Sequence, residues 1–541
     1  MKQTIIKLLK KELKLSEKQI ENLIEIPPNP NLGDYSFPCF ILSKTYKKSP
    51  DQIAENLRKK IKLPKELEQI QALGPYLNFF INKKLLAQNI VKEILTRKDK
   101  YGKSNIGKSQ KILIEHTSIN PNASPHVGRA RNAIIGDSIT RIIKFVNFKP
   151  EVHYYVNNVS KQIAMLVLAN ADKLKFQQML KEYIEISSKV EKSKRLEQEV
   201  FDLLNKFEKG DKTVTKKFKK ITDTCVKGQK EILKGMGIEY DSFDYESDYL
   251  KDSTRILNLL KKSKKLFKDS DGRLVLNQTG TKIEKKMKAP FFVLTRSDNT
   301  GLYPLRDISY TIYKNKIAKD NLIVLGEDQK LYFEQLTEAL KLLKITSPKV
   351  IHYSFILLGE KDRSKKMSTR KGTVVLLEDF LNKAIKKSKQ KVVGIGAVKY
   401  SILKNNPNKS IFFDLDEALS FEGDTGPYLQ YSYARASSIL KKAKSKQTKN
   451  FKIKTLKPKE IELTKKLAQF PEVVLSSYNN LNPSHIANYS YQLAKVFSEF
   501  YHDCPVINSD NENFRLALVQ SFRYVLKNSL SLLGIDVLER M

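Results

Sequence analysis

The chain has 541 residues and 40% of them are hydrophobic, so it is too long for a single core and too apolar to be disordered. No run approaches the ~18 apolar residues of a membrane span, and the Lys-rich start lacks the pattern of a signal peptide. The cysteines Cys39, Cys225 and Cys504 form no CxxC pair. We therefore expect a cytoplasmic protein with no disulfide framework, no zinc site and no membrane partner.

The net charge of +39 has two interpretations. Lys and Arg bind phosphates, which favours a polyanionic partner such as a nucleic acid. A general lysine bias on solvated surfaces would give the same excess, because the lysines are spread along the whole chain rather than gathered in one patch. Charge alone does not separate the two.

Residues 1–105 are predicted to form a small α+β domain. A Lys-rich amphipathic helix opens the chain, a turn-rich segment follows at 26–38, and PYLNFFIN at 75–82 has the composition of a strand. The polar YGKSNIGKSQ at 101–110 resembles a linker.

From residue 111 the pattern becomes that of a βαβ unit. KILIE at 111–115 predicts a buried strand, apolar residues at helical spacing between 135 and 146 predict a helix, and EVHYYV at 151–156 predicts a second strand. Residues 160–240 are Lys/Glu-rich and predict an inserted helical region with no identifiable chemistry.

The alternation resumes near residue 290. FFVLT at 291–295, NLIVLG at 321–326 and VIHYSFILLG at 350–359 predict strands, with helices between them. Two such halves around an insertion predict an α/β fold over 106–415, with a doubly wound, Rossmann-type parallel sheet. Residues 416–541 are predicted to form an all-α bundle, interrupted by a basic connection at 441–460.

Ligands bind beyond the carboxyl ends of such strands, and three of these ends are informative. After KILIE come Pro125, His126 and Gly128, followed by a helix. A helix N-terminus attracts phosphate, Gly128 permits close approach, and His126 could donate a hydrogen bond to a phosphate oxygen. Taken alone, His126 fits an ordinary loop or N-cap residue better.

The second strand end leads into EKDRSKKMSTRKGTVV at 360–375, a loop with six basic residues. Such a loop suits a clamp that stabilises charge during phosphoryl or nucleotidyl transfer. In so basic a chain a merely solvated loop is common, and the position directly after a core strand is what argues against it.

The third end is LGEDQ at 325–329, with YPLRD at 303–307 nearby in the chain. Glu327, Asp328 and Asp307 add acidic groups to a basic site, which suggests a second, cationic substrate. For each aspartate taken singly, capping of the helix that follows is the simpler interpretation.

The first two ends together resemble the HIGH and KMSKS motifs of class I aminoacyl-tRNA synthetases. They read HVGR at 126–129 and KMSTR at 366–370, separated by about 240 residues. Longer segments resemble the arginyl-tRNA synthetase family over nearly the full length: GDYSFPCF, GPYLNFFIN, HTSINPNASPHVGRARNAIIGD, RSDNTGLYPLRDISYTIYK, KMSTRKGTVV, GDTGPYLQYSYARASSIL and RLALVQSFRYVLKNSLSLLGIDVLERM.

The resemblance implies a two-step reaction. ATP and L-arginine give arginyl-adenylate and pyrophosphate, and the arginyl group then passes to the 3′ end of tRNA(Arg). Mg²⁺ would accompany ATP, and most members of the family need bound tRNA before they activate arginine. The resemblance also implies a domain that contacts the tRNA elbow at 1–105, an anticodon-binding domain at 416–541, and a monomer.

The same resemblance assigns residues. His126, Gly128, Lys366 and Met367 would bind ATP, and the catalytic group comprises His126, Gly128, Arg129, Lys366, Ser368 and Lys371. Asp307 and Tyr303 would bind the guanidinium, which asks for a carboxylate and hydrogen-bond acceptors. Glu115 and Asn120 would hold the backbone end of arginine, with Gln329 nearby and Glu246 as a further carboxylate.

Two departures from the family motifs stand out. Arg129 replaces the last histidine of HIGH, and Thr369 replaces the second lysine of KMSKS. Relatives that lack this lysine usually carry one three residues before the HIGH histidine, where this chain has Ala123. Our hypothesis is that Lys366, Lys371 or Arg129 substitutes. Another class I synthetase and a non-catalytic tRNA-binding relative remain as alternatives to an active enzyme.

Overall fold

The computed structural model describes residues 2–298, 300–358, 365–366, 375–443 and 451–541. They form two compact units. Unit 1 comprises residues 1–101, 436–469 and 495–525, and unit 2 comprises residues 102–435, 470–494 and 526–541. The helices α17 (Gly426–Lys442), α20 (Ser484–Asp503) and α21 (Glu512–Leu532) therefore contain residues of both units.

The first hundred residues form the expected α+β arrangement. Three antiparallel strands lie in the order β1 (Tyr35–Pro38), β3 (Tyr76–Ile81), β2 (Leu67–Leu73). The helices α1 (Lys2–Glu12), α2 (Glu17–Leu23) and α4 (Pro50–Lys60) share one apolar core with this sheet. α1 is Lys-rich on its exposed face and buries Ile5, Ile6 and Leu9 in this core, so its apolar face packs the helix against the rest of the domain.

A five-stranded parallel sheet organises unit 2, as predicted for a Rossmann-type fold. Its order is β11 (Lys349–Tyr353), β10 (Asp320–Gly326), β4 (Lys111–Glu115), β5 (Lys149–Val156), β6 (Ser242–Tyr245). Because β5 lies on one side of β4 and β10 on the other, the chain changes direction at β4. This switch point opens a crevice at the carboxyl ends of the strands.

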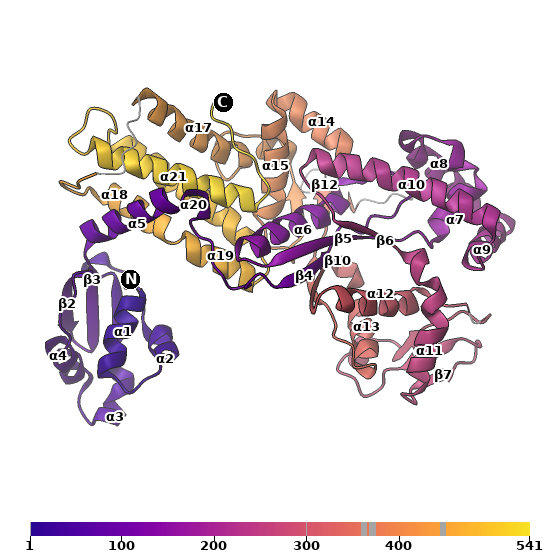
Figure 1. Cartoon of the computed structure of the whole chain (residues 1–541), viewed down its shortest axis with the longest axis horizontal. Coiled ribbons are helices and arrows are strands. Elements are labelled where there is room, and N and C mark those ends of the chain that lie inside the picture. Colours follow the sequence, from indigo (N-terminus) through magenta and orange to yellow (C-terminus); the bar gives the residue numbers. More distant parts are fainter. Residues whose placement is uncertain (1, 299, 359–364, 367–374, 444–450) are drawn as a thin grey trace. The chain divides into compact units, whose positions relative to one another are not determined.

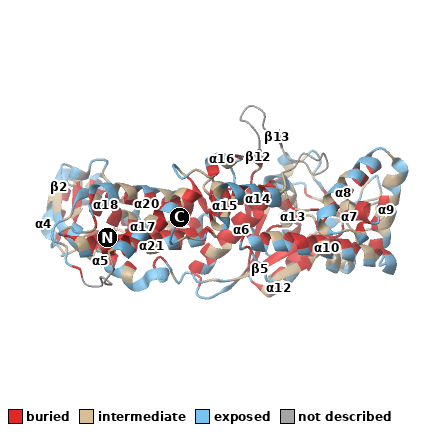
Figure 2. Ribbon diagram, turned by 90° about the horizontal axis from the view of Figure 1, so that it is seen from above, coloured by how far each residue is buried: buried red, intermediate tan, exposed pale blue. Residues whose placement is uncertain are grey.

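Helix α6 (Val127–Phe145) follows β4 and lies alongside the sheet (Figure 1). Its ribbon is mostly buried (Figure 2), because fourteen of its residues are buried, including polar Arg131, Asn132 and Asp137. Gly136 makes this packing possible, since a Cβ atom there would lie 2.2 Å from Cγ of His116.

The predicted helical insertion is confirmed between β5 and β6. It comprises α7 (Lys161–Leu168), α8 (Phe176–Glu191), α9 (Lys194–Glu208) and α10 (Lys212–Gly235). These helices have their own apolar core, in which the rings of Phe207 and Phe218 stack with centroids 4.2 Å apart.

Two of the predicted strands are arranged differently in the structure. Residues 291–293 form β9 (Phe291–Val293) of a separate antiparallel sheet with β7 (Leu266–Lys268) and β8 (Leu274–Asn277). VIHYSFILLG is split into β11 and β12 (Ile356–Leu358), and β12 pairs instead with β13 (Lys365–Lys366) and β14 (Ile411–Phe413). The break has a physical cause: the guanidinium of buried Arg131 binds the carbonyl oxygens of Ser354 and Phe355, at 2.7 and 3.3 Å.

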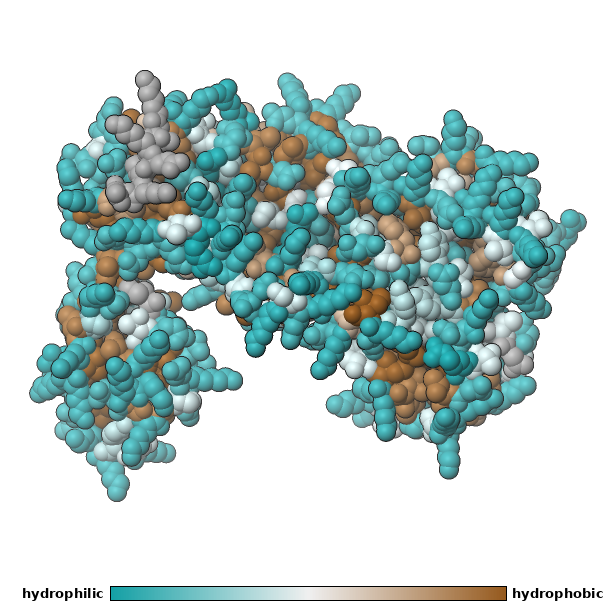
Figure 3. All heavy atoms as spheres, in the orientation of Figure 1, coloured by the Kyte–Doolittle hydropathy of each residue, from teal (hydrophilic) through white to brown (hydrophobic). Residues whose placement is uncertain are grey.

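The C-terminal part is helical, as predicted. α14 (Leu377–Ser388) and α15 (Lys391–Leu403) pack together, and α19 (Phe470–Asn479) contacts α6. α18 (Pro458–Ala468) belongs to unit 1. Hydrophilic side chains cover most of the face shown in Figure 3. Within the described ranges no helix is long and apolar enough to cross a membrane.

Candidate active site

The crevice at the switch point holds a cavity of about 320 Å³. Glu115 at the end of β4, Gly326 at the end of β10 and Tyr353 at the end of β11 all line it. The cavity brings together all six residues predicted for arginine: Glu115, Asn120, Glu246, Tyr303, Asp307 and Gln329. Whether they bind arginine stays a prediction.

Asp307 and Tyr303 lie one turn apart on α12 (Tyr303–Ile317) and therefore face the cavity from the same side. Tyr332 donates a hydrogen bond to Oδ2 of Asp307, and the rings of Tyr303 and Tyr332 are 4.9 Å apart. Burial raises the pKa of Asp307 to about 6, the Tyr332 hydrogen bond opposes that rise, and nearby Glu115 adds to it. A buried acid of this kind is suited to receive a cation.

Helix capping explains neither aspartate of the third strand end. α12 begins at Tyr303 with Leu302 as its N-cap, so Asp307 lies inside the helix. Asp328 is exposed in the short 3-10 helix Glu327–Gln329, and the N-cap of α13 (Lys330–Leu342) is Gln329. Of the acidic residues of this strand end, only Asp307 lines the cavity.

Glu246 is already partly occupied by a side chain of the protein. Nε of Arg306 donates to its Oε1 at 2.6 Å, and both side chains are less than 5% exposed. The second oxygen, Oε2, is buried and has no hydrogen-bond partner among the described residues. Burial raises the pKa of Glu246 to about 7, with Arg306 opposing the rise. Glu246 therefore offers one free acceptor to a ligand.

Several residues in or next to the cavity were not predicted from the sequence. Arg306 pairs with Glu246, Lys314 forms a buried ion pair with Glu115, and the rings of Tyr155 and Tyr310 stack at 4.5 Å. The sequence does contain a pattern that groups three of them. Arg306, Tyr310 and Lys314 are spaced by four in one predicted helix and so occupy one face of it.

His126 is the N-cap residue of α6, but its side chain makes no capping hydrogen bond. Its Nδ1 is buried and unpartnered within the described part of the chain. Burial lowers the pKa of His126 to about 4, and Arg129 contributes in the same direction, so the ring is neutral at pH 7. The N-cap interpretation thus leaves its imidazole unexplained.

The segment after the basic loop is attached to the His126 segment. The Val127 N–H donates to the Val375 carbonyl at 3.0 Å, and the Leu377 N–H donates to the Pro125 carbonyl at 2.8 Å. Lys366 has its backbone in β13. Met367, Ser368, Thr369 and Lys371 lie outside the described residues. The structure therefore brings the flanks of the two motifs together.

Comparisons with known proteins find similarity to arginyl-tRNA synthetases along the whole length of the chain. Family models match as "Arginyl tRNA synthetase N terminal domain" at residues 1–81, "tRNA synthetases class I (R), catalytic domain" at 90–412 and "DALR anticodon binding domain" at 429–541. The arginine–tRNA ligase of Methanocaldococcus jannaschii is 36% identical, over 97% of this chain and 96% of that protein. The chain belongs to the arginyl-tRNA synthetase family.

Other relatives support this membership. The arginine–tRNA ligase of Clostridium perfringens is 34% identical over the full length of both chains. The solved structure of Thermus thermophilus arginyl-tRNA synthetase aligns with a TM-score of 0.82 and 26% identity, covering 100% of this chain and 99% of that one. The family predicted from the sequence is confirmed.

In this member of the arginyl-tRNA synthetase family the loop before His126 is held by the insertion. Gln229 of α10 donates through Nε2 to the carbonyls of Asn120, at 3.0 Å, and Ala123, at 2.9 Å. Ala123 itself is buried, at 2% exposed. Arg129 lines the 320 Å³ cavity, so of the two departures from the family motifs it is Arg129 that places a cation there.

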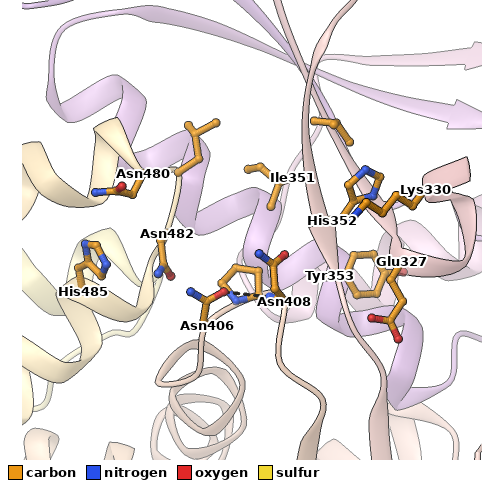
Figure 4. A pocket seen from close by; sticks show the side chains of 13 residues that line it. Glu327, Lys330, Ile351, His352, Tyr353, Asn406, Asn408, Asn480, Asn482 and His485 are labelled. Atoms are coloured by element: carbon orange, nitrogen blue, oxygen red, sulfur yellow. Dashed lines mark hydrogen bonds between the residues drawn. The ribbon is translucent and has the colours of Figure 1, made fainter. Parts of the chain in front are cut away.

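A second cavity of about 610 Å³ lies beside β11 (Figure 4). Asn406 and Asn408 border it on one side, Asn480, Asn482 and His485 on another, and His352 lines it from β11 (Figure 4). No described residue predicted for arginine or ATP lines this cavity.

Proposed function

We propose that this chain activates L-arginine with ATP and transfers the arginyl group to tRNA(Arg). Membership of the arginyl-tRNA synthetase family over the full length supports the reaction. The observation that best supports arginine as the substrate is the cavity at the switch point, in which acidic and amide side chains surround a space of about 320 Å³.

Arginine carries a cation at each end, and the cavity has an acid for each. Asp307 and Tyr303 would bind the planar guanidinium, with the free Oε2 of Glu246 as a further acceptor, and Gln329 would lie near the backbone end. Glu115 and Asn120 would hold the α-amino end. Charge-assisted hydrogen bonds of this kind are the strong ones, which favours arginine over neutral amino acids of similar length.

ATP would lie at the N-terminus of α6. The helix dipole there attracts phosphate, Gly128 lies in the first turn, and neutral His126 can donate a hydrogen bond. Lys366 and Met367 would contact ATP, with Ser368, Lys371 and Arg129 supplying further catalytic groups. An α-carboxylate oxygen of arginine attacks the α-phosphorus of ATP, and pyrophosphate leaves.

Mg²⁺ would arrive as the counter-ion of the ATP phosphates. Over the described ranges no group of three or more His, Cys, Asp or Glu side chains could hold a metal ion, so the proposal assigns it no protein ligands. In the second step a hydroxyl of the terminal tRNA ribose attacks the arginyl carbonyl, and AMP leaves.

The tRNA partner accounts for the net charge of +39, to which a lysine bias also contributes. We assign residues 1–105 to the tRNA elbow, 106–415 to catalysis and 416–541 to the anticodon, in a cytoplasmic monomer.

Aminoacylation of tRNA with single radiolabelled amino acids tests the proposal. Charging with arginine alone supports it. Charging with a different amino acid would indicate another class I synthetase, and tRNA binding without charging would indicate a non-catalytic relative.

A further inference from the structure

A buried ion pair lies at the floor of the arginine cavity. Nζ of Lys314 donates to Oε2 of Glu115, and their side chains are 4% and 5% exposed. Glu115 ends strand β4, whereas Lys314 lies on α12 two turns beyond Asp307, and both line the cavity. Lys314 thus holds one oxygen of Glu115, and the other, Oε1, is not used by this hydrogen bond.

Lys314 is in turn held by an aromatic ring. Its ammonium lies 4.4 Å from the ring centroid of Tyr310, one turn earlier on α12, in cation–π contact. The Tyr310 ring stacks on Tyr155, with an interplanar angle of 18°, and its hydroxyl donates to Oδ2 of Asp244 at 2.7 Å. His153 contacts the same carboxylate through Nδ1. The ring is therefore fixed on its face and at its hydroxyl.

A gain in folding stability is a weak explanation for the presence of such a buried ion pair. Two buried charges cost desolvation energy that their attraction repays only when the geometry is good, and an apolar pair often does as well. Removing one partner, however, leaves the other buried without a counter-charge. Without Lys314 the Glu115 carboxylate would also lose the group that fixes its position.

We propose that Lys314 is a positioning residue that holds the Glu115 carboxylate by one oxygen and aims the other at the α-amino group of arginine, with the Tyr310 ring holding Lys314 in place. The inference rests on the proposed function for the role of Glu115. It gives Lys314 no contact with the reacting atoms. Lys314 therefore acts on arginine binding and not on ATP binding.

Steady-state aminoacylation of the full chain tests this with Lys314→Gln and Lys314→Arg. We expect Lys314→Gln to raise the arginine KM roughly tenfold, the size of one charge-assisted hydrogen bond, with the ATP KM unchanged. Lys314→Arg keeps the charge and should restore the arginine KM to within about threefold of wild type.

A matched control separates positioning from folding. Lys399 is also buried, at 1% exposed, and binds the Gly534 carbonyl and Asp137 away from the cavity. Lys399→Gln should lower the thermal midpoint as Lys314→Gln does, but leave the arginine KM unchanged. An equal rise of the arginine KM in both variants would overturn the proposal, as would a wild-type arginine KM in Lys314→Gln.

An arginine analogue without the α-amino group gives a second readout. It does not use Glu115, so its inhibition constant should be the same for wild type and Lys314→Gln, and a rise equal to that for arginine would contradict the assignment. If Lys314→Gln does not fold, Tyr310→Leu keeps the lysine and should still raise the arginine KM, and an unchanged KM would overturn the inference. A wild-type enzyme that charges no arginine would instead refute the proposed function.

Discussion

Nε of Arg306 donates to Oε1 of Glu246 at 2.6 Å, so one carboxylate of the cavity proposed for arginine is already paired with a guanidinium of the chain itself. Arg306 also donates to the Gly301 carbonyl at 3.0 Å, which fixes it in the wall. The carboxylate of Asp307, the next residue, accepts a hydrogen bond from a neutral group, the Tyr332 hydroxyl. Of these two neighbouring residues of α12, Arg306 pairs with Glu246, and Asp307 is the carboxylate that we propose for the substrate.

Asp307→Asn should raise the arginine KM by about 10- to 100-fold, because a charge-assisted hydrogen bond becomes a neutral one. The ATP KM should stay the same. Steady-state charging at varied arginine concentration measures both values. Asp328→Asn, an exposed aspartate outside the cavity, is the matched control and should behave as wild type. Equal effects of the two substitutions would contradict the assignment of Asp307.

Arginine binding should weaken as the pH falls through about 6. The pKa of Asp307 is raised to about 6 by burial, so below that value a proton must leave before the guanidinium pairs with it. The arginine kcat/KM should therefore rise with pH, first as Asp307 loses its proton near pH 6 and then as Glu246, with its pKa raised to about 7, loses its own. Asp307→Asn should flatten the lower part of this rise, and a pH profile identical to that of wild type would refute the link.

The same raised pKa values affect stability with the opposite sign. In the folded chain Asp307 and Glu246 hold protons up to pH values of about 6 and 7, whereas in the unfolded chain they lose them near pH 4. Between pH 4 and 7 the folded state thus binds more protons, and the contribution of these two groups to the free energy of unfolding falls as the pH rises.

Part of this site was predictable from the sequence. Glu115 ends a predicted strand, His126 lies in a short motif and Asp307 lies in the YPLRD segment, so the local sequence points to each of them. The spacing of Arg306 and Lys314 shows a shared helix face, but their contacts, like that of Tyr332, depend on how α12 and α13 pack around the cavity. Likewise, VIHYSFILLG has the composition of one strand. The strand is broken where the Ser354 carbonyl accepts a hydrogen bond from Arg131, and these two residues are 223 positions apart in the sequence.

His126→Ala should reduce arginine activation by about 100-fold or more, the usual loss when a donor to a developing charge is removed. Pyrophosphate exchange in the presence of tRNA measures this step. Because the pKa of His126 is lowered to about 4, the wild-type rate should show no ionisation of this histidine between pH 6 and 8. Activation unchanged in His126→Ala would remove His126 from the site.

The compensation for the absent motif lysines has a direct test. Arg129→Ala removes one of the cations that line the cavity, and Lys371→Ala removes a cation from the basic loop. We expect at least one of them to slow adenylate formation by about tenfold. If both left adenylate formation unchanged, the idea that either residue substitutes would be wrong.

Gly136→Ala should destabilise the fold by about 2 kcal/mol, because its Cβ atom would lie 2.2 Å from Cγ of His116 and the helix must shift. Thermal unfolding measures the effect. Gly235→Ala, in α10 with nothing within 4 Å of the added Cβ atom, is the control and should be neutral or slightly stabilising. Equal midpoints for the two variants would contradict the tight packing of α6 on His116.

The central claim is that the switch-point cavity selects arginine for transfer to tRNA. Aminoacylation of tRNA(Arg) with radiolabelled arginine, run in parallel on wild type and Asp307→Asn at one low arginine concentration, tests it most directly. Rapid charging by wild type with a strong reduction in Asp307→Asn is the predicted result. Equal charging by both proteins, or none by wild type, would contradict it.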